Sequence, residues 1–183
     1  IYQCDWSSDV CSSDLSFQRL FDLLGLPQAQ LNRMAENLRF ATDIHTDNQS
    51  SSQAPLPPQT VPQLVWLGIA PSTAQALEPY VALLPARTPV NLNTAPAEVI
   101  YASINGVTLA EAQELVARRA TNPFRTVTEA TRVLPQHAAA MSEGTVAIAS
   151  RFFEVRGRLR LDRLVLEERS LRSEEHTSEL QSH

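Results

Sequence analysis

The sequence predicts an α+β fold that is mainly helical and carries its strands at the C-terminal end. Three observations lead to this class. Apolar residues recur at helical spacing in several segments between residues 16 and 134, and Ser, Thr, Gly and Pro bound these segments as caps and stops. Residues 153–161 then change to strict alternation, which is typical of a strand. Helices followed by strands favour α+β over an alternating α/β architecture.

The two ends of the chain differ in character from the part between them. Residues 1–15 and 172–183 resemble sequencing-adapter DNA translated by mistake, and we expect neither segment to belong to the fold. These flanks hold both cysteines, six of the 20 acidic residues and one of the 15 basic residues, which leaves 14 residues of each charge in residues 16–171. This neutral, cysteine-free part predicts neither a disulfide framework nor a thiolate zinc site.

Residues 16–89 are predicted to form a first helical region. An amphipathic helix stops at Gly25, and a second one, with its apolar residues on one face, follows it. Residues 42–62 are rich in Ser, Gln and Pro and are predicted to be a disordered loop. Two short helices complete the region, one ending at Gly68 and one capped by Ser72.

Residues 90–135 are predicted to form a second helical module built around a helical hairpin. After a short extended entry, Thr94 is expected to cap the first hairpin helix, and a turn at Gly106 separates it from the second. Two capping boxes mark the next helix starts, Thr108 with Glu111 and Thr126 with Glu129.

Residues 145–171 are predicted to be strands. From Phe153 to Leu161, apolar side chains alternate with charged ones, and Leu164–Leu166 resume the pattern after a break at Asp162. Val146 and Ile148 indicate an earlier, short strand. Because a lone hairpin is only marginally stable in water, we expect a segment upstream of Phe17 to complete this sheet.

The composition favours a structural or binding role over an enzymatic one. The five glycines are too scattered for a phosphate-binding loop, and no Ser, His and acid grouping has a recognisable catalytic spacing. No apolar run reaches the roughly 20 residues that a membrane helix needs. We therefore expect no catalytic residue in this chain.

One acidic loop is the candidate metal site. Asp43 and Asp47 flank His45, and carboxylates in a loop can bind a hard cation such as calcium. The spacing does not match an EF-hand loop, and no second acidic cluster follows. The sequence thus favours a solvated polar loop, with Asp43 and Asp47 as the candidate calcium ligands.

The hairpin raises the alternative of DNA binding. Hairpins that bind a DNA backbone use a Gly-rich turn whose amides approach a phosphate, with basic residues nearby. Here Thr108 occupies the place of the second glycine, and the chain has no Lys. Three nearby glutamates also offset Arg118 and Arg119. The pattern therefore favours packing against protein over binding to nucleic acid.

The segment "PVNLNTAPAEVIYASINGVTLAEAQELVARRATNPFRTVTEATRVL" resembles the second helical, SAM-like module of the general secretion pathway protein K family, the large minor pseudopilin of type II secretion systems. Weaker similarity extends to "LPARTP" and "ASRFFEVRGRLRL". The main motif positions are Asn91, Asn93, Thr94, Gly106, Arg119 and Phe124, and Thr108 and Glu111 belong to the same hairpin.

This resemblance implies a non-catalytic subunit at the tip of the pseudopilus, which supports export of folded proteins across the outer membrane. It implies a pilin-like domain with an inserted helical region, anchored in the inner membrane by an N-terminal helix, with this region in the periplasm. The implied partners are the I- and J-type minor pseudopilins, and calcium is the implied ligand of the acidic loop. The alternative is a DNA receptor of competence type, whose Asn-Thr-Ala entry and Pro-Phe pair are similar.

Overall fold

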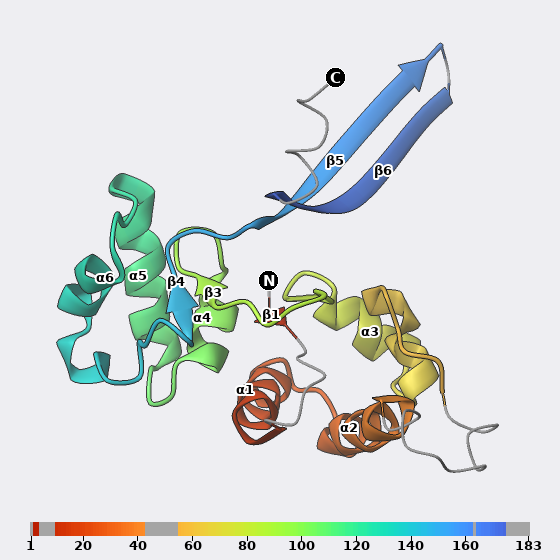
Figure 1. Ribbon diagram of the computed structural model, residues 1–183, viewed down its shortest axis with the longest axis horizontal. Coiled ribbons are helices and arrows are strands. Elements are labelled where there is room, and N and C mark those ends of the chain that lie inside the picture. The colour runs from red at the N-terminus through yellow and green to blue at the C-terminus, as the bar shows by residue number, and fades with distance from the viewer. Residues whose placement is uncertain (1, 4–9, 43–54, 163, 175–183) are drawn as a thin grey trace. The chain divides into compact units, whose positions relative to one another are not determined.

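The computed structural model describes residues 2–3, 10–42, 55–162 and 164–174 and shows a chain of helices and strands (Figure 1). Two compact units make up the chain, Ile1–Ile148 and Ala149–His183. The longer helices lie in the first unit, and a long strand pair forms the second. The predicted α+β class is therefore confirmed.

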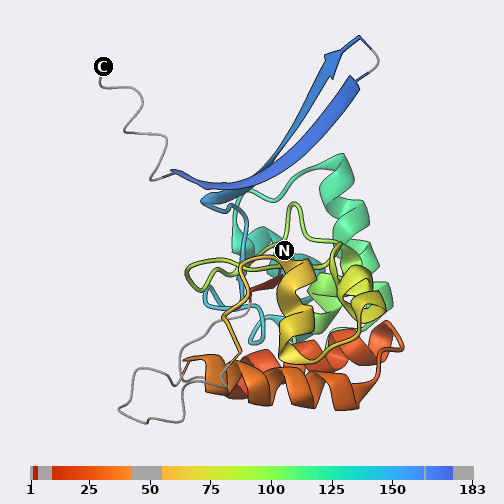
Figure 2. The same ribbon diagram turned by 90° about the vertical axis from the view of Figure 1, so that its right-hand side faces the viewer.

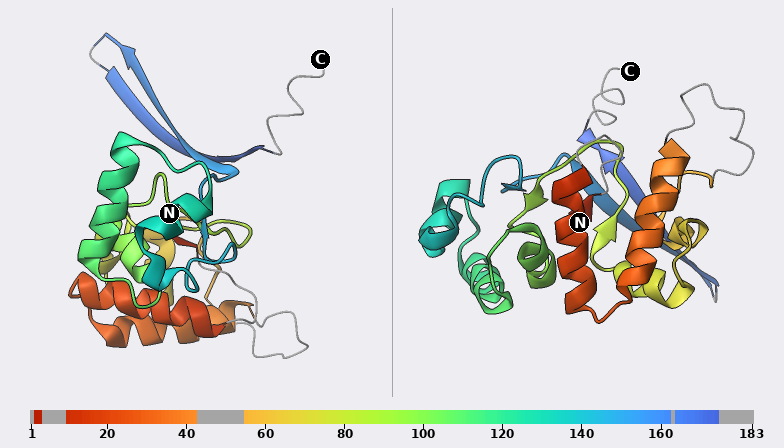
Figure 3. Two further views of the ribbon diagram at one scale, coloured as in Figure 1. Left: turned by 90° about the vertical axis from the view of Figure 1, so that its left-hand side faces the viewer. Right: turned by 90° about the horizontal axis from the view of Figure 1, so that it is seen from below.

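The first unit begins with a helical core. Helices α1 (Val10–Leu23) and α2 (Gln28–Thr42) lie side by side and are joined at Gly25 (Figures 2 and 3). The 3-10 helix η3 (Val61–Leu67) packs against α2 and against α3 (Pro71–Leu77). Strand β2 (Val81–Ala82) pairs in parallel with β1 (Tyr2–Gln3). The side chains that fill this first core include Phe17, Leu20, Phe21, Leu31, Met34, Leu64, Leu67 and Leu77.

The buried side chains of η3 follow the same three-residue period as its 3-10 backbone. Its buried residues Val61, Leu64 and Leu67 are three apart, which matches three residues per turn. The helix ends at Gly68, whose φ of 88° lies in the left-handed region. A Cβ at Gly68 would also lie 2.6 Å from Cδ of Arg33. The predicted stop at Gly68 is confirmed, since both the backbone and the space require glycine.

Helix α3 begins differently from the prediction. The expected cap at Ser72 is wrong, because Pro71 is the first helical residue and Ala70 precedes it as N-cap. Proline suits this position, since its fixed φ is helical and its missing N–H would have no partner there. The Ala70 amide donates instead to Oε1 of Gln30 in α2, at 2.8 Å.

The second core of this unit surrounds the helical hairpin. Its short parallel strands pair Val90 with Val146 and Asn91 with Ala147. Every element of this core except η4 contributes buried apolar side chains. The buried residues of the core include Leu92, Val99, Ile100, Ile104, Val107, Leu115, Phe124 and Leu134. In chain order, its elements are β3 (Val90–Asn91), α4 (Ala97–Ser103), α5 (Leu109–Thr121), α6 (Val127–Val133), η4 (Pro135–His137) and β4 (Val146–Ala147).

Helix α4 also starts later than expected. The predicted cap at Thr94 is wrong, because the helix begins at Ala97 and Pro96 is its N-cap. The carbonyl of Asn91 accepts from the amides of Thr94 and Ala95, at 3.1 and 2.8 Å. This turn occupies residues 91–95, so the helix starts only after it, and Thr94 is exposed.

The second unit is an antiparallel hairpin of β5 (Phe152–Leu161) and β6 (Leu164–Ser173). The turn passes through Asp162, which adopts a φ of 51°. The partner strand is longer than the sequence pattern indicated, since it continues from Leu166 to Ser173, beyond the start of the trailing flank.

The two faces of this hairpin differ in chemistry. On one face, Glu154 contacts Arg156 and Arg169, and Arg158 contacts Glu167. Six apolar side chains share the other face, as the register with Leu159 opposite Leu166 and Leu161 opposite Leu164 requires. These residues form the apolar hairpin face and are exposed by 42–71%: Phe153, Val155, Leu159, Leu161, Leu164 and Leu166.

Candidate functional site

The hairpin turn between α4 and α5 is held by its own buried residues. Ile104 and Val107 are almost fully buried and fix the turn on the second core. Between them, Gly106 has a φ of 83°, and a Cβ there would lie 3.4 Å from Nδ1 of His137. The positive φ therefore favours glycine here, and a Cβ would lie in van der Waals contact with the His137 ring.

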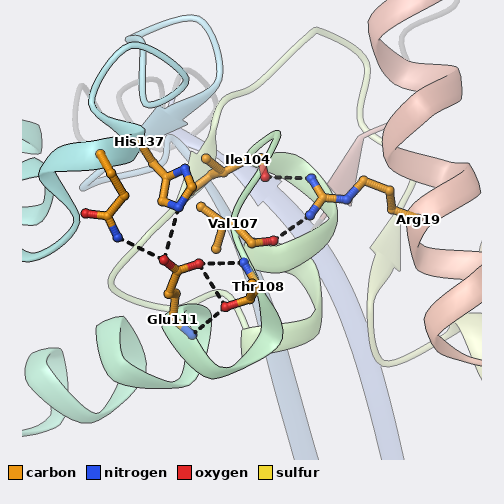
Figure 4. Close-up of polar contacts among 7 residues, drawn as sticks. Arg19, Ile104, Val107, Thr108, Glu111 and His137 are labelled. Carbon is orange, nitrogen blue, oxygen red and sulfur yellow. Dashed lines mark hydrogen bonds and ion pairs between the residues drawn. The ribbon is translucent and has the colours of Figure 1, made fainter.

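The start of α5 carries the predicted capping box, which is confirmed. The Oγ1 of Thr108 accepts from the Glu111 amide at 3.3 Å, and Oε2 of Glu111 accepts from the Thr108 amide at 2.7 Å. The same carboxylate reaches beyond its helix, because its Oε1 accepts from Nε2 of Gln136 at 2.8 Å and lies 3.1 Å from Nε2 of His137 (Figure 4). Glu111 thus joins the hairpin to η4 as well as capping α5.

These donors hold Glu111 in its ionised form. Hydrogen bonds from the Thr108 amide, the Thr108 hydroxyl and the Gln136 side-chain amide, with a smaller contribution from His137, together lower the pKa of Glu111 to about 2 against the opposing effect of burial. An ionised carboxylate can only accept hydrogen bonds. The Nε2 of His137 must therefore carry the hydrogen that lies between the two side chains.

A carboxylate at this place opposes phosphate binding. In a hairpin that binds DNA, the amides at the turn and at the start of the second helix are directed at a phosphate. Here the Thr108 amide is bonded to Glu111, and the negative charge lies at the N-terminus of α5. A phosphate would have to displace a side chain that four hydrogen bonds hold in position.

Asn93 is the centre of a second polar cluster. Its Nδ2 donates to the carbonyls of Phe124 and Ile148, at 2.9 and 3.0 Å, and its Oδ1 accepts from the Phe124 amide at 2.9 Å. The three bonds connect residues that lie 31 and 55 positions away in the sequence. One amide side chain therefore ties the entry of the module to the segment after α5 and to the exit of β4.

Two further motif residues support the same entry. The Oδ1 of Asn91 accepts from the Asn93 amide at 3.0 Å, which shapes the turn. From α5, Arg119 donates to the carbonyl of Leu92 through Nη1. Burial lowers the pKa of the Arg119 guanidinium from its ordinary value. The structure thus brings Asn91, Asn93, Arg119 and Phe124 together, whereas Thr94 lies exposed at the edge of the turn.

Sequence reasoning missed three residues of the hairpin environment. Gln136 and His137 follow Pro135, and no spacing pattern relates them to Glu111, 25 and 26 positions earlier. Arg19 of α1 donates to the carbonyls of Ile104 and Val107, both at 2.6 Å (Figure 4). Nothing in the local sequence of α1 distinguishes this arginine from one exposed to solvent.

The candidate calcium ligands Asp43 and Asp47 lie outside the described residues. Within residues 2–3, 10–42, 55–162 and 164–174, no three His, Cys, Asp or Glu side chains are placed so that they could hold a metal ion together.

The geometry defines a helical module built around a hairpin whose turn and entry are closed by the chain's own side chains. Residues 90–150 match the family model described as type II secretion system (T2SS), protein K. The predicted resemblance to the type II secretion protein K family is confirmed over residues 90–150. A search of curated proteins finds no match to the chain.

Proposed function

We propose that this chain is a non-catalytic minor pseudopilin, located at the tip of the type II secretion pseudopilus, that supports export of folded proteins across the outer membrane. The observation that carries the proposal is the agreement between the family match and one closed structural module. The match begins at β3 and ends shortly after β4, and these strands pair with each other.

The hydrogen bonds inside this module support a scaffold role. Asn93 and Arg119 bind backbone carbonyls of the module itself, and Glu111 binds its own helix start and η4. Side chains that serve an active site usually converge on a pocket and leave groups available for a substrate. In this module the motif side chains instead fix backbone segments to one another.

The apolar hairpin face supports a pilin-like arrangement of the second unit. The two strands lie about 5 Å apart, so with their side chains they form a face about as wide as one α-helix. Strands of ten residues extend for roughly 30 Å, so a helix could lie along the whole face. Apolar side chains follow that face along β5 and along the start of β6, at Leu164 and Leu166, and Glu168, Ser170 and Arg172 occupy the remainder of it on β6. We propose that it packs against an N-terminal helix upstream of Phe17, together with further strands of a pilin-like sheet.

The proposed location follows from the family. We propose a single N-terminal span in the bacterial inner membrane, with the helical module and the hairpin in the periplasm. Among the described residues, no helix combines the length and the apolar character that crossing a membrane requires. The proposed partners are the I- and J-type minor pseudopilins, in a complex at the pseudopilus tip.

Co-purification tests the proposal. The chain is produced together with tagged I- and J-type minor pseudopilins, and the complex is measured by size-exclusion chromatography with light scattering. We expect one complex that contains all three chains. Failure of the folded chain to enter the complex, combined with submicromolar, salt-sensitive binding to duplex DNA in a gel shift, would favour the competence-type alternative.

A further inference from the structure

Arg19 forms a cap on the hairpin from outside the module that the family model matches. Helix α4 ends at Ser103, and Ile104 follows as its C-cap. The carbonyls of Ile104 and Val107 each accept from one terminal nitrogen of the Arg19 guanidinium, at 2.6 Å (Figure 4). The guanidinium carbon also lies 4.3 Å from the centre of the Tyr101 ring, one turn back in α4. These four residues are called the Arg19 cap below.

The chemistry of the cap suits an arginine. Carbonyls at the end of a helix lack partners within the helix, and the C-terminal end carries partial negative charge. A guanidinium presents several donors in one plane, so it can bond two carbonyls and lie over an aromatic ring at once. A lysine carries its charge at one point and can reproduce only part of this set.

The cap lies where the two cores meet, since Ala102 of α4 belongs to the first core and Tyr101 packs against both cores. Phe17, Leu20 and Phe21 of α1 belong to the first core, together with residues of α2, η3 and α3. Ile104 and Val107 belong to the second core. Both cores lie in the same compact unit, and α1 packs against α4. Arg19 therefore fixes the helix of one core to the turn of the other through hydrogen bonds.

We propose that the Arg19 cap couples the two helical cores so that they open and unfold as one unit. Without the cap, α1 and α4 keep their apolar contact, but the turn carbonyls lose their charged partner. The second core then opens by itself, more often than the first. The cap also places α1 over the turn between α4 and α5, so this turn becomes a contact between helices of the two cores.

Amide hydrogen exchange on the full chain tests this coupling. In the unaltered protein, the slowest amides of α5 and those of η3 and α3 should show one common opening free energy. In Arg19→Gln, we expect the α5 amides to exchange roughly tenfold faster than the slowest first-core amides. The reason is that losing a hydrogen bond to a charged group changes the opening equilibrium constant by at least that factor. Arg19→Lys should give a smaller separation.

Arg118→Gln is the matched control, because Arg118 lies exposed on α5 and the substitution is the same. It should leave the common opening intact. The proposal is contradicted if the two cores already exchange separately in the unaltered protein. It is also contradicted if Arg19→Gln, or Arg19→Lys where the glutamine variant does not fold, changes both cores by equal factors.

Discussion

Replacing Asn93 should remove the contact that closes the helical module. Asn93→Ala deletes two donated hydrogen bonds and one accepted bond, at 2.9–3.0 Å. Each such bond contributes about 1 kcal/mol net, and the partners left behind are backbone groups that then depend on water. The side chain is half-buried, so water can reach part of the site. We expect a loss of about 2–4 kcal/mol in the free energy of unfolding.

Asn93→Asp should cost more than Asn93→Ala, although it is closer in shape. The carboxylate keeps an acceptor for the Phe124 amide, but it places negative charge against the carbonyls of Phe124 and Ile148. A loss of this size is a large part of the 5–15 kcal/mol that stabilises a typical domain. Both variants should therefore unfold at clearly lower urea concentration.

Urea denaturation followed by circular dichroism measures the loss, and hydrogen exchange at the Phe124 amide locates it. Asn122→Ala is the control, because Asn122 is exposed two residues before Phe124, and it should change stability by less than about 0.5 kcal/mol. If Asn93→Ala falls within that same range, the polar cluster does not hold the module together and the reasoning is refuted.

Three other predictions concern the helical hairpin of α4 and α5 and the acidic loop with Asp43 and Asp47. Because the pKa of Glu111 in the folded protein is lowered to about 2, its contribution to stability is present above the ordinary carboxyl pKa and is lost as the pH falls toward 2. The unaltered protein should therefore lose more stability over that acid range than Glu111→Gln does. Urea midpoints measured as a function of pH test this, and equal losses in the two proteins would contradict it. Gly106→Ala should cost about 1–2 kcal/mol because φ is positive there, whereas Gly144→Ala should be close to neutral; equal effects in urea denaturation would refute the steric argument. Calcium should leave the melting temperature unchanged, and a calcium-dependent rise that Asp43→Asn abolishes would show that the loop binds the ion.

Local signals in the sequence were sufficient for features whose partners lie within one helical turn. The box of Thr108 with Glu111 and the stop at Gly68 are of this kind. The second predicted box is only half formed, since Thr126 accepts from the Glu129 amide but the Glu129 carboxylate accepts from the Arg125 amide. At Thr94 and Ser72, a neighbouring proline set the start of the helix instead of the hydroxyl residue.

Contacts between distant segments could not be obtained in this way. The motif pattern named Asn93 and Phe124, but not the bonds that join them across 31 residues or the bond to Ile148. Arg19 lies 85 residues from Ile104, and its role depends on how α1 packs on α4. Periodicity reports which face of a helix is buried, and it carries no information about which distant carbonyl a polar side chain reaches.

A module exchange tests the central proposal, that residues 90–150 can work in place of the matching module of a type II secretion protein K. The corresponding module of a functional protein K is replaced by residues 90–150 of this chain, and export of a secreted enzyme is measured in cells that lack their own protein K. We predict that the hybrid restores export and that the same hybrid with Asn93→Asp restores much less. Export that stays at the level of the deletion strain, although the hybrid protein accumulates in the envelope, would contradict the account.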